Sequence, residues 1–173
     1  MIVLLLGGAC SGKSLVAEQL AAALPPPVTY LATAVVDEAD ADHAERVAAH
    51  RHRRDPAWTT IEVGGDLAAA LATTAGSALV ESLGTWVTAR WAEEPVDLSP
   101  SVAELCAALQ TRAGDTVVVS EEVGLGVHPS SEAGRRFREA LGAVNLAVAA
   151  VADDVHLVVA GRLLLLQRPE VDP

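Results

Sequence analysis

The stretch Met1–Ser14, MIVLLLGGACSGKS, decides the fold. Its apolar run, Ile2–Leu6, ends at two glycines, which is typical of a strand buried on both faces of a sheet. The next residues, Gly7–Ser14, fit the pattern G-x-x-x-x-G-K-[ST], a loop whose backbone amides wrap around phosphate groups. Apolar residues then recur every four positions until Pro25–Pro27 ends the pattern. The sequence therefore predicts a strand, a phosphate loop and a helix, in that order.

The rest of the chain alternates between predicted strands and predicted helices. Strands are expected at 28–33, 59–63, 77–81, 116–120 and 155–160. Helices are expected at 37–54, from 66, around Trp86 and Trp91, from Ser99 or Ser101 to about 112, and from Ser130 or Ser131 toward 152. This alternation favours an α/β fold with a mostly parallel sheet and helices on both faces. A chain of 173 residues is expected to form one domain over 1–173.

Composition narrows the classes of function. Hydrophobic residues make up 51% of the chain and aromatic residues 3%, so the core is expected to consist of Ala, Val and Leu. A net charge of -11 argues against a protein that coats nucleic acid or an anionic membrane. No stretch is long enough to predict a membrane span. With only two cysteines and no need of a disulfide, a soluble protein in the reducing cytoplasm is expected.

The phosphate loop carries the most specific chemistry. Lys13 is expected to reach the β- and γ-phosphate oxygens, and the hydroxyl of Ser14 to hold Mg²⁺. Lys13 is also the only lysine in the chain, which fits a crowded loop where a planar guanidinium would not. The alternative, a simple glycine turn, is disfavoured because a strand precedes the loop and a helix follows it. Cys10, within the loop, is interpreted as a small filler rather than a nucleophile.

A second candidate is the segment RVAAHRHRR, residues 46–54. In a helix, His50 would have Arg46 one turn before it and Arg53 and Arg54 one turn after it. Arginines there would collect phosphate oxygens and keep the imidazole neutral, and so nucleophilic. From the charge pattern alone, a solvated basic helix face remains the alternative.

Acidic residues lie at or just after the ends of three predicted strands. Glu62 and Glu81 fall at strand ends, where ligands of open α/β sheets bind, so both are candidates for contacts with a nucleotide or with Mg²⁺-bound water. Ordinary solvated acids at the ends of strands are the alternative for each. Glu121 and Glu122 follow the strand TVVVS and precede a glycine-rich loop, and Glu122 is the candidate general base or metal-orienting acid.

With these motifs quoted, the sequence resembles the bifunctional adenosylcobinamide kinase and adenosylcobinamide-phosphate guanylyltransferase family of cobalamin biosynthesis. The resemblance rests on segments in the family's order: GGACSGKS (7–14), YLATA (30–34), RVAAHRHRR with Trp58 and TTIE (46–62), LVESLGTWVT (79–88), VVVSEEVGLGVHP (117–129), RRFREALGAVN (135–145) and ADDVHLVVAG (152–161). They span nearly the whole chain. HRHRR followed by tryptophan and TIE, and then EVGLGVHP, are more specific than the phosphate loop.

The resemblance implies a P-loop NTPase-like (RecA-like) fold and two successive reactions. ATP or GTP would phosphorylate the aminopropanol hydroxyl of adenosylcobinamide, and GMP from GTP would then pass to that phosphate through a guanylylated His50. The implied catalytic residues are His50, Lys13 and Glu122, and Ser14 and Glu81 are implied near Mg²⁺. The implied nucleotide-binding positions are Gly7, Gly8, Ala9, Cys10, Ser11, Gly12, Lys13, Ser14, Ala32, Thr33, Ala34, Arg51, His52, Arg53, Arg54, Glu62 and Glu81. A homo-oligomer with a corrinoid substrate is also implied.

The sequence departs from the usual family pattern at a few positions. Cys10 stands where arginine is common, Glu121 where asparagine is usual, and Leu146 where glutamine is common. These departures leave open the preference between ATP and GTP and the retention of both activities. A P-loop small-molecule kinase without nucleotidyl transfer is the runner-up. A GTPase-like switch is disfavoured, because its N-K-x-D signature needs a second lysine.

Overall fold

In the computed structural model of the protein, residues 1–34, 51–93 and 97–169 are described. The described strands form one seven-stranded sheet in the order β3-β2-β4-β5-β1-β6-β7. The strands are β1 (Ile2–Gly7), β2 (Val28–Ala32), β3 (Thr59–Glu62), β4 (Ser77–Glu81), β5 (Thr116–Glu121), β6 (Asp154–Val159) and β7 (Arg162–Leu165). The helices are α1 (Lys13–Ala22), α3 (Leu67–Thr73), α4 (Leu83–Glu93), α5 (Ser99–Thr111) and α6 (Glu132–Val151).

The sheet is parallel from β3 to β6, as the alternation of elements predicts. The carboxyl ends of these strands therefore meet at one edge, where β1 leads into the phosphate loop. The seventh strand, β7, pairs antiparallel with β6 and was not among the predicted strands. The turn between them is tight, with Ala160 and Gly161 both at positive φ. A run of four leucines with no alternation of polar residues gave no signal for an exposed edge strand.

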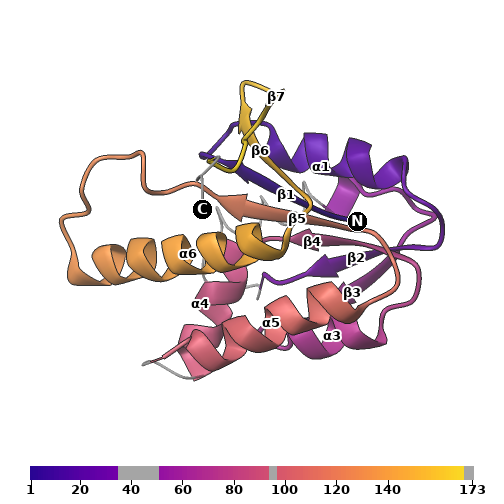
Figure 1. The fold of residues 1–173 in the computed structure, drawn as a ribbon, viewed down its shortest axis with the longest axis horizontal. Helices are drawn as coiled ribbons and strands as arrows, with labels where there is room; N and C mark the ends of the chain where they lie inside the picture. The colour runs from indigo at the N-terminus through magenta and orange to yellow at the C-terminus, as the bar shows by residue number, and fades with distance from the viewer. Residues whose placement is uncertain (35–50, 94–96, 170–173) are drawn as a thin grey trace.

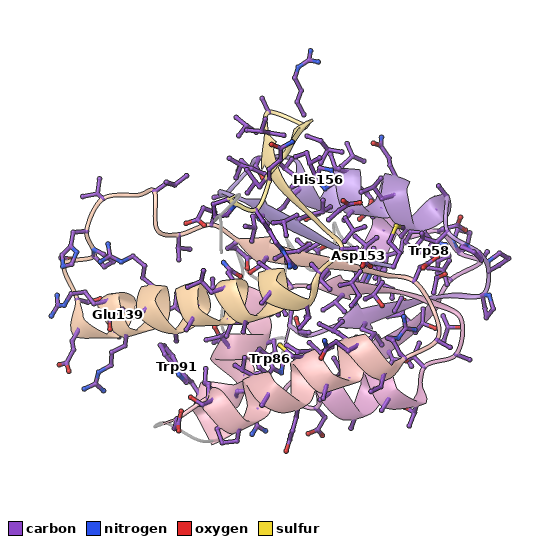
Figure 2. The ribbon with its side chains drawn as sticks, in the orientation of Figure 1. Trp58, Trp86, Trp91, Glu139, Asp153 and His156 are labelled. Atoms are coloured by element: carbon purple, nitrogen blue, oxygen red, sulfur yellow. The ribbon has the colours of Figure 1, made fainter. Side chains whose placement is uncertain are left out.

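Helices cover both faces of the sheet (Figure 1). A separate hydrophobic core lies between the helices and the sheet on each face. On one face, α1 buries Val16, Ala17 and Ala21 against β1, β2 and β5. On the other face, α3, α4, α5 and α6 bury a larger cluster built mainly of leucine, valine and alanine. Trp86, labelled in Figure 2, is the largest side chain in that cluster. Its indole Nε1 donates to the carbonyl of Gly65 at 3.0 Å. The aromatic-poor core predicted from composition is confirmed.

The helix ends agree only partly with the predicted caps. The hydroxyl of Ser131 accepts a hydrogen bond from the amide of Gly134 at 3.1 Å, which confirms Ser131 as the cap of α6. Neither predicted serine caps α5. Asp97 instead accepts from the amide of Ser99 at 2.9 Å, and the hydroxyl of Ser101 accepts from Arg90 at 2.9 Å. The Asp97 carboxylate thus pairs with the first amide of α5 from the residue before the cap position, Leu98.

One side of α6 packs against the rest of the protein and the other faces solvent. Leu141, Val144 and Val148 are buried under the sheet, whereas Leu146 is 76% exposed.

No helix in the described ranges combines the length and the apolar character that a bilayer crossing requires.

Candidate nucleotide site

The phosphate loop joins β1 directly to α1, as its motif predicts. Gly12 adopts a left-handed conformation with φ of 87° at the start of α1. A Cβ at this position would lie 3.1 Å from the Cα of Gly161, so the β6–β7 turn also restricts the loop to glycine. The amide of Gly161 donates to the carbonyl of Ser11 at 2.8 Å. The β6–β7 hairpin, whose second strand was not predicted, thus contacts the phosphate loop through Gly161.

Cys10 belongs to this loop and adopts a positive φ of 57°. Its side chain is exposed and lines the cavity described below. The interpretation of Cys10 as a small filler rather than a nucleophile stays a prediction.

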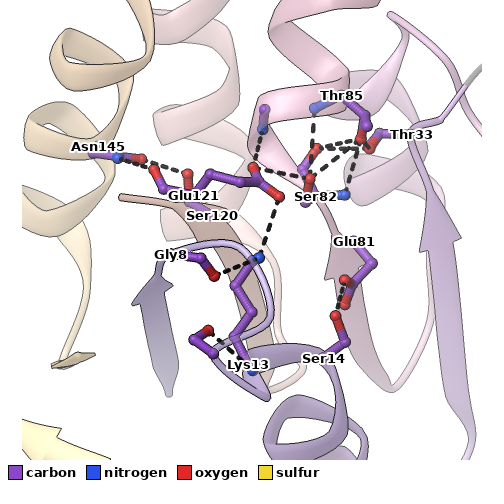
Figure 3. A network of polar contacts seen from close by, with 12 residues as sticks. Gly8, Lys13, Ser14, Thr33, Glu81, Ser82, Thr85, Ser120, Glu121 and Asn145 are labelled. Atoms are coloured by element: carbon purple, nitrogen blue, oxygen red, sulfur yellow. Dashed lines mark hydrogen bonds and ion pairs between the residues drawn. The ribbon is translucent and has the colours of Figure 1, made fainter. Parts of the chain in front are cut away.

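The ammonium group of Lys13 is held inside the loop by two oxygens (Figure 3). Its Nζ lies 3.4 Å from the carbonyl oxygen of Gly8 and 3.7 Å from Oε1 of Glu121. The side chain of Lys13 is only 12% exposed. Lys13 thus lies over the phosphate loop, whose backbone amides bind phosphate groups in proteins with this motif.

Ser14 and Glu81 meet on the opposite side of the loop. The Ser14 hydroxyl donates to Oε1 of Glu81 at 2.6 Å, and Glu81 is the last residue of β4. Burial is the main reason that the pKa of Glu81 rises from 4.5 to about 7, and the nearby carboxylates of Glu121 and Glu18 raise it further. The Ser14 hydrogen bond and the charge of Lys13 act in the opposite direction. The second oxygen of Glu81, Oε2, is buried and has no hydrogen-bond partner among the described residues.

The arginines that follow His50 reach the same edge of the sheet. Arg51 pairs with Glu62 at the end of β3, and Arg53 Nη2 lies 3.5 Å from Oε1 of Glu18 on α1. The guanidinium of Arg54 lies 3.8 Å from the centre of the Tyr30 ring, a cation–π contact. His50 itself, and Arg46 before it, lie outside the described residues.

One cavity of about 680 Å³ joins these two groups of side chains. Its walls include most of the predicted site residues: Ala9, Cys10, Ser11, Gly12, Lys13, Ser14, Ala32, Ala34, Arg51, Arg53, Arg54, Glu62, Glu81 and Glu122. The cavity is also lined by residues that sequence reasoning did not assign, namely Leu15, Tyr30, Ser82, Thr85, Glu121 and Val123. A space of this size matches the small-molecule sites of enzymes. A larger hollow of about 1080 Å³ lies elsewhere, between α4, α5 and α6.

Four predicted contact positions do not line the cavity: Gly7, Gly8, Thr33 and His52. Thr33 is fully buried, and its hydroxyl shares hydrogen bonds of 2.6 Å with the carbonyl of Ser82 and the hydroxyl of Thr85. Thr33 therefore stabilises the turn between β4 and α4 through these hydrogen bonds and does not line the cavity. His52 is exposed.

The two adjacent glutamates after β5 have different surroundings. Glu122, the predicted general base, turns back on its own loop, where its Oε1 accepts from the amide of Gly124 at 2.6 Å. Glu121 points into the phosphate site instead, next to Lys13 (Figure 3). Both carboxylates line the cavity, but they contact different groups within it. The signal for Glu121 was its position as the last residue of a strand beside β1.

The geometry of the phosphate loop and its cavity agrees with the protein family that the sequence matches. The family model described as cobinamide kinase / cobinamide phosphate guanyltransferase matches residues 3–166. The chain is 38% identical over 162 residues to the bifunctional adenosylcobalamin biosynthesis protein CobP of Pseudomonas aeruginosa, covering 91% of this chain and 92% of that protein. It is 33% identical over 178 residues to the bifunctional adenosylcobalamin biosynthesis protein CobU of Salmonella typhimurium, covering 93% and 97%. The chain therefore belongs to the cobinamide kinase / cobinamide phosphate guanyltransferase family.

Proposed function

We propose that this protein catalyses both reactions of its family: phosphorylation of adenosylcobinamide by ATP or GTP, and transfer of GMP from GTP onto the resulting phosphate. The observation that carries the proposal is the single cavity lined by Lys13 and Ser14 on one side and by Arg51, Arg53 and Arg54 on the other. A kinase alone needs the first group of residues, whereas the second group supplies cations around a further phosphoryl centre.

In the kinase step, the backbone amides of the loop and Lys13 bind the β- and γ-phosphates. The oxygens of Ser14 and Glu81 fit Mg²⁺, because hard oxygen donors are what this cation prefers. The buried, unpartnered Oε2 of Glu81 gives that carboxylate an acceptor which no described protein group satisfies. Bound Mg²⁺ would neutralise charge on the transferring phosphoryl group. Glu122, at the cavity wall, is the proposed base for the substrate hydroxyl.

In the second step, His50 is the proposed nucleophile. A neutral imidazole nitrogen attacks the α-phosphorus of GTP, so that a P–N bond forms and the bond to pyrophosphate breaks. An oxygen of adenosylcobinamide phosphate then attacks the same phosphorus, which breaks the P–N bond and forms adenosylcobinamide-GDP. Arg51, Arg53 and Arg54 would stabilise the charge that develops on the α-phosphate.

The arginines leave their present partners to do this. Glu62 and Glu18 now balance Arg51 and Arg53, and an arriving triphosphate competes with those carboxylates. The side chains of Arg51 and Glu62 are 47% and 60% exposed, so exchange of that pair costs little, whereas Glu18 is 10% exposed and its release from Arg53 costs more. We also propose the remaining expectations of the resemblance, namely a homo-oligomer, a corrinoid substrate and a cytoplasmic setting.

The decisive experiment uses His50→Asn with His128→Asn as its matched control. His128 is exposed and contacts Arg138, away from the cavity. His50→Asn should abolish covalent labelling by α-labelled GTP and the formation of adenosylcobinamide-GDP, while phosphorylation of adenosylcobinamide continues. His128→Asn should retain both activities. Absence of acid-labile label from the wild-type protein would favour the kinase without nucleotidyl transfer.

A further inference from the structure

Glu121 connects three parts of the phosphate site. Its Oε1 lies 3.7 Å from Nζ of Lys13, and its Oε2 accepts hydrogen bonds from the Ser82 hydroxyl at 3.1 Å and from the Gly84 amide at 3.0 Å (Figure 3). Gly84 belongs to the first turn of α4, so this carboxylate links the phosphate-loop lysine to the start of a helix. Both oxygens are therefore committed to groups of the site.

The fold holds Glu121 in this position. It ends β5 directly opposite Gly7, the first residue of the loop motif. Its backbone carbonyl accepts from the side-chain amide of Asn145, a buried residue of α6, at 3.1 Å. A Cβ at position 84 would lie 2.2 Å from Oε2 of Glu121, so the carboxylate docks there only because residue 84 is glycine.

This position places negative charge where phosphate groups bind. The ammonium of Lys13 is the cation that the loop motif supplies for the triphosphate, and Glu121 now neutralises it. Glu81 adds a second carboxylate at the same site, and its buried Oε2 has no partner among the described residues. The carboxylate of Glu121 lies beside the loop, so a highly charged free triphosphate meets a like charge and an occupied lysine. A divalent cation on the triphosphate removes most of that repulsion.

We propose that Glu121 is a positioning residue that holds Lys13 in the empty site and makes triphosphate binding depend on a divalent cation. The inference rests on the nucleotide site of the proposed function. In the empty protein, Glu121 keeps the ammonium folded over the loop. When the triphosphate arrives with its cation, Lys13 turns to the phosphates and Glu121 stays anchored to Ser82 and Gly84. Free triphosphate, without a cation, has to displace Lys13 from Glu121 against the repulsion of that carboxylate.

The test is a calorimetric titration with α,β-methylene GTP, in which the α–β linkage resists attack at the α-phosphorus. Wild-type protein and Glu121→Gln are each titrated with EDTA present and with Mg²⁺ present. The glutamine oxygen can still accept from Gly84, so the anchor on α4 is preserved. Without Mg²⁺, the Kd of Glu121→Gln should be about tenfold lower than that of the wild type. With Mg²⁺, the two values should agree within about threefold, so the gain from Mg²⁺ shrinks in the variant.

Two further variants separate charge from structure. Glu121→Asn also lacks the charge and should show the same reduced dependence on Mg²⁺. Glu104→Gln removes an acid from α5, on the opposite face of the sheet from α1, and should bind as the wild type does with and without Mg²⁺. Thermal midpoints of all variants report whether the fold is intact.

The remaining outcomes are distinct. Equal dependence on Mg²⁺ in the wild type and in Glu121→Gln would overturn the role of Glu121 while leaving the nucleotide site in place. Weaker binding by the same factor under both conditions would also overturn it, because Glu121 would then only support the structure. No binding by the wild type under either condition would overturn the proposed nucleotide site and this inference with it.

Discussion

The two walls of the nucleotide cavity are built differently. On the phosphate-loop wall, Lys13 is 12% exposed and pairs with Glu121 at the end of β5. Glu81 has a buried Oε2, and its Oε1 accepts a hydrogen bond from Ser14 on α1. On the arginine wall, the side chains of Arg51 and Glu62 are 47% and 60% exposed and pair mainly with each other. The first wall is the more buried of the two, whereas the contacts of the second are open to solvent and can be exchanged for phosphate oxygens. Substitutions on the two walls should therefore differ in how much activity, stability or nucleotide affinity the protein loses.

The largest effect is expected at Lys13. Lys13→Ala removes the cation that stabilises charge on the transferring phosphoryl group, and should lower kcat/KM for phosphorylation of adenosylcobinamide about 1000-fold. A coupled assay for nucleoside diphosphate measures it. Lys13→Arg keeps the charge but brings a planar guanidinium into a nearly closed space, so it should restore only a small part of the activity. Full activity in Lys13→Arg would show that the loop is roomier than its burial indicates.

A large effect on stability is expected at Glu81. Because the pKa of Glu81 rises from 4.5 to about 7, the folded protein retains this proton at a pH where the unfolded chain releases it. The charge thus destabilises the fold increasingly as the pH rises from about 4.5 to about 7, and the full penalty persists above that. Glu81→Gln should therefore stabilise the protein, free of nucleotide and divalent ions, by about 2 kcal/mol more at pH 8.5 than at pH 5.5.

Urea unfolding of the wild type and of Glu81→Gln at both pH values measures this difference. Glu104→Gln, which removes an exposed acid from α5, is the control and should show no comparable dependence on pH. A stabilisation by Glu81→Gln that is the same at both pH values would contradict the buried, protonated state of this carboxyl group.

The smallest effect is expected on the arginine wall. Arg51→Ala breaks an exposed ion pair, so it should change the free energy of unfolding by less than about 0.5 kcal/mol. The same variant should weaken the binding of α,β-methylene GTP by about threefold to tenfold, because one cation of the cavity is lost. Urea unfolding and calorimetry measure the two quantities. A loss of stability without a loss of affinity would mean that Arg51 supports the fold and not the nucleotide.

Part of the site was predictable because its signals are local. The motif Gly7–Ser14 requires a strand before it and a helix after it, and both are present. Glu62 and Glu81 were predicted at strand ends, and they end β3 and β4 at the shared carboxyl edge. Parallel pairing then brings strand ends that are distant in sequence into one cavity.

Other features depend on contacts between distant segments. Thr33 follows a strand in the same way as a ligand-binding residue, yet its neighbours in sequence give no sign of Ser82 and Thr85, which form hydrogen bonds with its hydroxyl. Glu121 and Glu122 are adjacent residues of the same type, so the sequence does not distinguish them. Only the pairing of β5 with β1 decides which of them faces Lys13. The strand β7 lacks a periodic pattern and is defined by its hydrogen bonds to β6.

The amino-acid sequence by itself determined the order of the described strands and helices up to β6, the phosphate loop and the family, because backbone propensity and motif spacing are properties of neighbouring residues. Tertiary structure alone decided which carboxylates are buried and which side chain holds Lys13. Burial and Coulomb interaction depend on distances across the sheet, and those distances are fixed only when β1, β4 and β5 lie side by side.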